Sequence, residues 1–517
     1  MKSITVTKLG RTLRYARASL DAWRMHNGRD ELVRQRAGRH LRDRLGRLRG
    51  LPQKVGQMLS MTSDTEQADL FIPLGSAAPA LDFADLTPHL ELAWGKQPNE
   101  ICQEINPEGL AASLGQVHQA RLHDGRQVAV KIQYPGMSEA LDTDLSALGW
   151  IARPVGNLRD GFDMTDYQNA LRESLKEELD YEAEAANQKD MARAAADSKL
   201  DLVVPTVIDE LSTDKVLTST WEEGGTHLHT RTWEAPERGL LGRRMVSQFL
   251  TMIFDHGLMH ADPHPGNYRF RLGADGPQVV LYDYGCVHRM TERERMVLLR
   301  LITEASNSSS KADPFPLLVE LGFDADLLKP LRHKLPALCR ILFEPFSKGG
   351  KFDMDSWNLS ERVSDVLGDD RMNFRIAGPA KLMFFLRAFH GLRFHLAELG
   401  EPVSWSIPMR ELQLRHGPAM AALEFSEPAS KDSSYSGLAT SLCIQVSEHG
   451  ETKARITLPA TAVERLESFV DEDLQAKIDA REIDLDAIVS RVRAQQFAPQ
   501  SIFSLEDGDK HIVIWLE

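Results

Sequence analysis

The sequence lacks the features of a membrane-spanning, disulfide-bonded or zinc-stabilised protein. Among its 517 residues there is no run of about 18 uninterrupted apolar residues, so we expect no transmembrane helix. The four cysteines are far apart and include no Cys-x-x-Cys pair, which argues for a reducing compartment. The N-terminus has no apolar signal-peptide core. We therefore expect a cytoplasmic protein, with a mitochondrial transit peptide as the alternative for its arginine-rich start.

Positive charge is concentrated at one end of the chain. Residues 1–57 hold 15 lysines and arginines and 4 acidic residues, a net charge of +11, whereas the remainder holds 46 basic and 71 acidic residues, a net of −25. Such a basic segment either binds an anionic surface such as lipid headgroups or packs on the acidic remainder. We favour the second interpretation and keep a peripheral membrane contact open. We expect no nucleic-acid partner.

The chain is too long for one hydrophobic core, and its pattern changes along its length. Strand-like segments dominate its first half, and helical segments follow from about residue 238. The pattern predicts an α+β protein with two lobes and a cleft between them. The predicted units are a basic helical extension (1–62), a small lobe (63–225), a helical lobe (226–425), a serine-rich linker (426–437) and a small α+β domain (438–517).

Several elements can be predicted individually. Residues 117–133 form a hairpin, with Asp124-Gly125 as a two-residue turn, and residues 268–285 form a second one. A long helix from Asp166 to about Ala195 places Glu177, Asp180 and Glu184 on one stripe. The most apolar window, residues 380–399, contains Arg387 and Arg393 and is typical of a buried core helix.

Four polar features have an ordinary explanation when each is taken alone. Lys131 alternates with Val128, Val130 and Ile132 and so points away from the core, where it is an exposed lysine or a phosphate-binding charge. The acidic stripe is a solvated helix face or a partner for that lysine. Asp262 and Asn267, in the proline-stiffened stretch HADPHPGN, form an Asx turn or an active loop. Asp283 ends the apolar strand VVLYDYG as a turn residue or a metal ligand.

The order of these features is more informative than any one of them. Phosphoryl transfer needs a lysine for phosphates, a carboxylate that orients it, an aspartate near the nucleophile, and an asparagine and a second aspartate for magnesium. Protein kinases supply these groups in a fixed order along the chain. This chain supplies them in the same order, with Asp and Asn five residues apart: Lys131, Glu184, Asp262, Asn267 and Asp283. The order predicts a kinase-like fold.

Further motifs resemble those of the UbiB/AarF-type (ADCK-like) atypical kinase family. Lys54 to Gln57 spells its K-x-G-Q motif, and Glu178 to Asp180 its E-x-D motif. The stretch LAASLGQVHQA resembles its alanine-rich nucleotide loop, which assigns Ala111, Ala112 and Ser113 to ATP binding. Glu184 resembles the glutamate that pairs with the strand lysine, and HADPHPGN and DYG complete the set.

The resemblance implies ATP or ADP and Mg²⁺ as ligands, and ATPase or small-molecule or lipid phosphotransferase activity linked to ubiquinone or isoprenoid-lipid metabolism. It implies a K-x-G-Q helix laid across the cleft. Lys54 then joins Lys131 and Asp262 as a catalytic residue, and Gln57, Glu178 and Asp180 line the cleft. Lys131 and Glu184 contribute to the ATP site, and Asn267 and Asp283 bind the metal.

Two other functions remain open. A cleft-covering helix is also compatible with a nucleotide-sensing scaffold that has no turnover. His260, Asp262 and His264 spell H-x-D-x-H, a pattern of metal-dependent hydrolases, but Pro263 and Pro265 preclude the helix that would align the histidines. The C-terminal unit has no convergent polar set, so we expect it to bind a protein partner.

Overall fold

The computed structural model describes most of the chain from residue 80 to residue 516. The described ranges are 80–112, 114–137, 176, 179–307, 309–310, 312–347, 349–379, 381–425, 439, 441–448, 451–463, 485–494, 497, 500–507 and 510–516. The predicted extension 1–62 and linker 426–437 lie outside them. So do four of the predicted site residues: Lys54, Gln57, Ser113 and Glu178.

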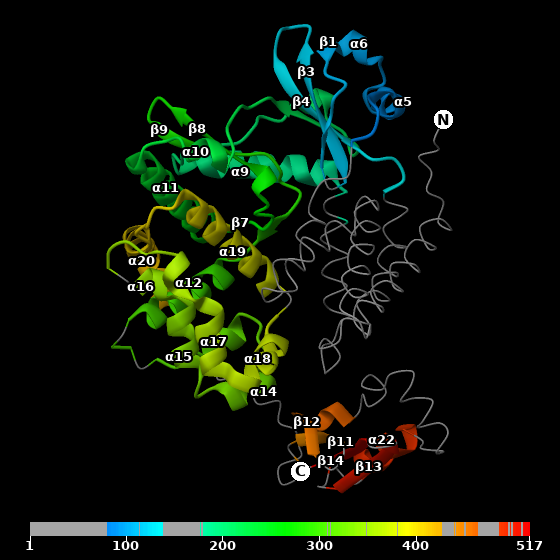
Figure 1. Ribbon diagram of the computed structural model, residues 1–517, viewed down its shortest axis with the longest axis vertical. Coiled ribbons are helices and arrows are strands. Elements are labelled where there is room, and N and C mark those ends of the chain that lie inside the picture. Colours follow the sequence, from blue (N-terminus) through cyan, green and yellow to red (C-terminus); the bar gives the residue numbers. More distant parts are fainter. Residues whose placement is uncertain are drawn as a thin grey trace, which may run out of the picture.

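The described residues form an α+β structure with two lobes, as predicted (Figure 1). The smaller lobe is an antiparallel sheet in the order β1-β3-β4-β6, with the short β2 added to β3. Two helices, α5 and α6, precede the sheet, and Leu86 and Leu90 of α5 are buried. The bounds are α5 Phe83–Trp94, α6 Pro98–Ile101, β1 Cys102–Ile105, β2 Leu110–Ala111, β3 Gly115–Leu122, β4 Gln127–Gln133 and β6 Val216–Thr220.

The β3–β4 hairpin confirms the sequence prediction, but its turn differs in detail. The Gly125 amide donates to Leu122 O at 3.0 Å, so His123 and Asp124 are the central residues of the turn. Gly125 follows them at φ +90°, a backbone conformation that glycine adopts without strain. The predicted two-residue Asp124-Gly125 turn is therefore wrong by one position, because the loop closes with an additional residue.

Helix α9 (Tyr181–Asp197) begins later than predicted. Asp180 has extended backbone angles and caps the helix, its side chain accepting from the Ala183 amide at 3.0 Å. An aspartate is favoured at this position because its oxygen satisfies one of the free amides of the first turn. The predicted stripe is therefore wrong at Asp180, which lies outside the helix, whereas Glu184 is in its first turn and buried.

The larger lobe is mainly helical and contains two small sheets. In one, β5 pairs in parallel with β9, which pairs with β8; in the other, β7 pairs with β10. Capping boxes start the two central helices, α11 at Glu234 and α12 at Thr291. The strands are β5 Leu202–Val203, β7 Leu258–His260, β8 Tyr268–Gly273, β9 Gly276–Leu281 and β10 Val287–Arg289.

The helices of this lobe share one large apolar core, which includes Trp357 and Trp405. The predicted core helix is present as α19 (Leu382–Leu399) and lies beside α11 near β7 (Figure 1). The other helices are α10 His227–Thr230, α11 Ala235–Phe254, α12 Glu292–Ser306, α13 Phe315–Glu320, α14 Ala325–Leu328, α15 Leu335–Leu342, α16 Glu344–Ser347, α17 Leu359–Leu367, α18 Arg371–Ala377 and α20 Ser406–Ala421.

The last part of the chain forms a sheet with a core of its own. Two hairpins are present, β11 with β12 and β13 with β14, and they join in the order β12-β11-β14-β13. The core includes Leu442, Val492 and Leu516. The bounds are β11 Ser441–Glu448, β12 Glu451–Pro459, α22 Leu485–Ala494, β13 Gln500–Asp507 and β14 Lys510–Leu516. Across the residues described, none of the helices is long and apolar enough to cross a bilayer.

Candidate nucleotide and phosphoryl-transfer site

Three charged side chains from distant parts of the sequence meet around Lys131. Strand β4 buries Val130 and Ile132 on one face and therefore directs Lys131 to the other. The Lys131 Nζ donates to Glu184 Oε1 at 2.6 Å and Oε2 at 2.8 Å, and to Asp283 Oδ2 at 3.2 Å. We call Lys131, Glu184 and Asp283 the lysine cluster. Three of the residues predicted from their order are thus brought together.

The lysine cluster carries one more negative than positive charge. Burial alone would lower the pKa of the Lys131 ammonium, but Asp283 and Glu184 outweigh it and hold that pKa well above its usual value. Burial raises the pKa of Glu184, whose side chain is only 1% exposed, and the Lys131 ammonium opposes that rise. Asp283 is the most exposed member, at 26%. The surplus negative charge therefore lies at the solvent-facing end of the cluster.

The turn after β9 is fixed by main-chain contacts. The Gly285 amide donates to Asp283 Oδ1 at 3.0 Å, and the Tyr284 amide approaches Glu184 Oε1 at 3.4 Å. One turn further along α9, Asn187 Nδ2 donates to Tyr284 O at 3.2 Å. Helix α9 thus holds both the lysine and the segment that carries Asp283. The role of Asn187 could not be predicted, since its partner is 97 residues away.

The HADPHPGN stretch is an ordered loop between β7 and β8, and it lies next to Asp283. It ends in a single turn of 3₁₀ helix, η3 (Pro265–Asn267). Asn267 Nδ2 donates to Asp262 O at 3.1 Å, which fixes one of these predicted site residues to the other. The Tyr282 amide donates to Asn267 O at 3.0 Å, and His260 Nε2 donates to Asp283 O at 2.7 Å. His260 therefore pins the loop to the DYG turn.

Asp262 has a buried partner that the sequence analysis did not assign. Arg387, on α19, donates from Nη2 to Asp262 Oδ1 at 3.1 Å. The two side chains are 3% and 7% exposed. The only signal in the sequence is that an arginine interrupts the most apolar window, which the analysis treated as a core helix. A buried arginine needs a buried anion, and that requirement could have prompted a search for its partner.

The residues around Asp283 fit a magnesium ion by their chemistry. Mg²⁺ prefers oxygen ligands and keeps waters and nucleotide phosphates in its shell. Asp283 supplies carboxylate oxygens, and the donation by Asn267 Nδ2 identifies Oδ1 as the acceptor end of that amide. Within the described ranges, no group of three or more histidine, cysteine, aspartate or glutamate side chains could hold a metal ion by itself. An ion here would need additional ligands, which nucleotide phosphates provide.

The alanine-rich segment forms a tight turn between β2 and β3. Ala111 pairs with Gln116, and the Ala112 amide donates to Gly115 O at 2.8 Å. That amide is engaged within the turn. Glycine is required at position 115, because a Cβ there would lie 2.4 Å from Ile132 O and 2.7 Å from the Tyr181 hydroxyl. The turn is thereby packed closely against β4 and the start of α9.

The histidines of the H-x-D-x-H pattern do not converge as metal ligands. His260 contacts the DYG turn, whereas His264 Nδ1 accepts from the Gly266 amide at 3.0 Å and caps η3. Asp262, between them in the sequence, pairs with Arg387. The arrangement gives the metal-dependent hydrolase interpretation no support.

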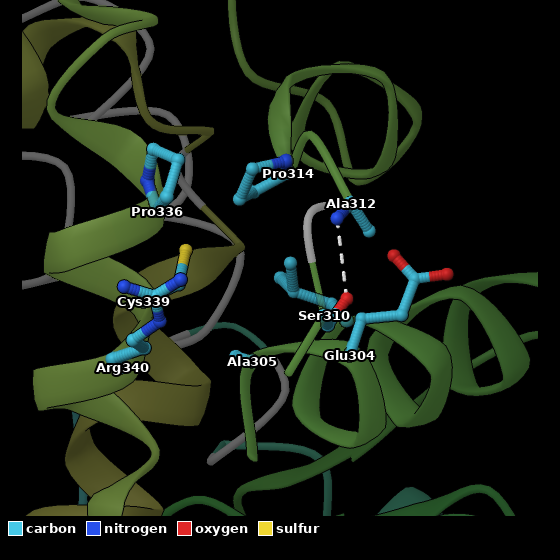
Figure 2. A pocket seen from close by; sticks show the side chains of 9 residues that line it. Glu304, Ala305, Ser310, Ala312, Pro314, Pro336, Cys339 and Arg340 are labelled. Atoms are coloured by element: carbon cyan, nitrogen blue, oxygen red, sulfur yellow. Dashed lines mark hydrogen bonds between the residues drawn. The ribbon is translucent and has the colours of Figure 1, made fainter. Parts of the chain in front are cut away.

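A hollow elsewhere in the larger lobe contains none of the predicted site residues. Figure 2 shows its lining from α12, α15 and the segment before α13, with Glu304, Ser310 and Arg340 at its edge. Cys339, which also lines it, is buried, and burial raises the pKa of its thiol to about 12. A thiol in that environment stays protonated and unreactive. The hollow has no chemistry comparable to that of the lysine cluster.

Comparisons with known proteins agree with this arrangement. The model of the ABC1 atypical kinase-like domain matches residues 73–312. The chain is similar to AarF domain-containing protein kinase 1 of Xenopus laevis, with 32% identity over 48% of this chain and 49% of that protein. It is similar to the atypical kinase coq-8, mitochondrial, of Caenorhabditis elegans, with 32% identity over 52% of this chain and 36% of that protein.

A third relative is the protein ACTIVITY OF BC1 COMPLEX KINASE 8, chloroplastic, of Arabidopsis thaliana, with 32% identity over 68% of this chain and 51% of that protein. The matches thus span about half the length of these curated relatives, or less. Residues 73–312 include Lys131, Glu184, Asp262, Asn267 and Asp283. The chain therefore contains an ABC1 atypical kinase-like domain, and over this region it is similar to AarF-type kinases.

Proposed function

We propose that the protein binds ATP or ADP with Mg²⁺ and either hydrolyses ATP or transfers its γ-phosphoryl group to a small molecule or lipid. The observation that carries the proposal is Lys131 held between Glu184 and Asp283. A lysine fixed in this way can bind phosphate oxygens, and the surplus negative charge favours a divalent cation beside Asp283. Magnesium held by Asp283 and Asn267 would offset the negative charge that develops on the phosphates.

The proposed roles of the other residues follow from their places around that cluster. Asp262 orients the attacking water or hydroxyl group, and Asn267 binds the metal together with Asp283. The donation from Asn267 Nδ2 to Asp262 O, 3.1 Å long, supports a fixed distance between these two functions. By the family resemblance, Lys54, Gln57, Glu178 and Asp180 belong to a segment that covers the cleft, and Ser113 to the nucleotide loop. Asp180 lies close to α9 as its cap.

The proposed setting is ubiquinone or isoprenoid-lipid metabolism, in the cytoplasm or at a membrane surface. It rests on the resemblance, with the basic residues 1–57 as the segment that would meet anionic lipid. Flotation with anionic vesicles, with and without residues 1–57, tests that contact. The domain 438–517 is proposed to bind a protein partner.

Magnesium-dependent ATPase activity of the wild type and Asp262→Asn tests the proposed function. We expect turnover in the wild type and a loss of roughly 100-fold or more in the variant. ATP affinity should be unchanged, because the lysine cluster is intact. Asp255→Asn is a matched control: this aspartate ends α11 and pairs with Arg415 at 2.8 Å, away from Lys131. Equal, near-zero rates with ATP still bound would instead identify a nucleotide-sensing scaffold.

A further inference from the structure

An ion pair buried in the larger lobe joins the HADPHPGN loop to helix α19. Arg387 Nη2 lies 3.1 Å from Asp262 Oδ1, and their side chains are 3% and 7% exposed. Removing two charges from water is costly, and replacing such a pair with apolar residues often stabilises a fold. The stability of α19 therefore gives no reason for an arginine at this position, since the neighbouring residues Ala388, Phe389 and Leu392 are buried and apolar.

The rest of α19 is fitted to the same loop. Arg387, Gly391 and His395 are four residues apart and share one face of the helix. A Cβ at Gly391 would lie 1.8 Å from Pro263 Cβ, so only glycine lets Pro263 approach the helix this closely. His395 packs against the ring of Tyr268, the residue after the loop, with ring centroids 4.3 Å apart. Three successive turns of α19 thus follow the loop.

We infer that Arg387 is a positioning residue, which holds the side chain of Asp262 in place during turnover. The guanidinium holds Oδ1, and Asn267 Nδ2 holds the main-chain oxygen of the same aspartate at 3.1 Å. Both ends of Asp262 are therefore constrained, while the pair contributes no net charge. The inference rests on the proposed function.

The test compares Arg387→Met and Arg387→Lys with the wild type by the kcat and KM of MgATP hydrolysis. We expect Arg387→Met to lower kcat by roughly 10- to 100-fold with little change in the KM for ATP, because orientation is lost but the lysine cluster is not. Arg387→Lys keeps a cation that can donate to Asp262 Oδ1, so kcat should fall less than in Arg387→Met, again with little change in KM.

Two further variants separate positioning from simple packing. If Arg387 acts through Asp262, adding Arg387→Met to Asp262→Asn should lower kcat no further than Asp262→Asn alone. Arg238→Met is the matched control: Arg238 pairs with Glu401 at 2.7 Å in the same lobe, and its loss should leave kcat and KM unchanged. The double variant contains neither buried charge, so it also reports on catalysis if Arg387→Met is too unstable to purify.

Each outcome decides the inference. Equal losses of kcat in Arg387→Met and Arg387→Lys, or additive losses in the double variant, would reduce Arg387 to a packing residue and leave the proposed function intact. A fall in kcat in Arg387→Met that comes with a large rise in the KM for ATP would show disturbed nucleotide binding and contradict the positioning role. A wild type without Asp262-dependent hydrolysis would remove the proposed function itself, and the positioning role with it.

Discussion

The two buried charge groups of the site differ in charge balance and in exposure. The lysine cluster has a surplus negative charge and is open to solvent at Asp283, which is 26% exposed. The Asp262–Arg387 pair is balanced, and neither side chain is more than 7% exposed. An unbalanced group at the surface attracts a cation, whereas a buried pair of equal and opposite charges does not. The difference suggests that the first group binds ligands and the second holds the loop in place.

The largest effect on stability is expected from Lys131→Met. It leaves Glu184 and Asp283 facing each other without a cation, which should cost roughly 3–5 kcal/mol in the free energy of unfolding. Lys189→Met is the control: Lys189 on α9 pairs with Asp209, and their side chains are 44% and 70% exposed. An exposed pair of that kind contributes about 0–1 kcal/mol. Chemical denaturation of both variants measures the difference, and equal losses would contradict a special role for the cluster.

Nucleotide binding gives a second way to distinguish the lysine cluster from the Asp262–Arg387 pair. Lys131→Met should abolish ATP binding, whereas Arg387→Met should retain it, because the two residues belong to different charge groups. Titration with ATP and Mg²⁺ followed by calorimetry measures both affinities. Retained ATP binding in Lys131→Met would mean that another cation holds the phosphates.

Gly391→Ala should have the next largest effect, on the loop side of the site. The added Cβ meets Pro263 at 1.8 Å, and overpacking of this kind costs roughly 1–3 kcal/mol. It should also reduce ATPase activity, since Pro263 follows Asp262. Gly417→Ala on α20 is the control, because a Cβ there meets nothing within 4 Å and alanine favours a helix by up to about 1 kcal/mol. Thermal unfolding and ATPase rates of the pair test this; a harmless Gly391→Ala would mean that the loop can shift away from α19.

A further prediction concerns acid stability, again on the loop side. Burial lowers the pKa of His390 to about 4 and that of His395 to about 3, from 6.5. The unfolded chain therefore binds protons that the folded chain excludes, and stability should fall as the pH decreases below 6.5, continuing towards these two values. The slope is about 1.4 kcal/mol per pH unit for each histidine.

Urea unfolding from about pH 8 down to about pH 5 measures that slope, a range in which unperturbed histidines titrate. His395→Gln should flatten it, and His89→Gln, which removes an exposed histidine on α5, is the control. A slope that His395→Gln leaves unchanged would assign the acid sensitivity to other groups.

The sequence predicted the lysine cluster better than its surroundings, for a physical reason. The chemistry of phosphoryl transfer requires particular residue types in a particular order, so Lys131, Glu184 and Asp283 could be assigned to one site before their contacts were known. Arg387 could not, because its partner is 125 residues away and helical periodicity records which face is buried, not what that face meets.

Two predictions were wrong in local detail, the start of helix α9 and the turn of the β3–β4 hairpin, and each error can be traced to nearby residues. The helix predicted from Asp166 was extended through Asp180 because acidic and alanine residues continue across it, although an aspartate is also a common cap. The Asp124-Gly125 turn was placed one residue late because aspartate–glycine pairs are frequent in shorter loops. The hairpin and the face of β4 that carries Lys131 were still correct, since alternation along a strand does not depend on the turn.

Helix α9 limits how the two lobes can move relative to each other. Near its start, Tyr181 and Ala185 pack with Leu217 of β6, and near its end, Met191 and Ala194 belong to a cluster with Met252 and Leu281 of the larger lobe. The helix is thus held by apolar contacts in both lobes. Pulling the lobes apart must break one of these two sets of contacts. Turning one lobe against the other about the helix axis must also shift the helix against one of them. Either motion therefore costs buried apolar contact.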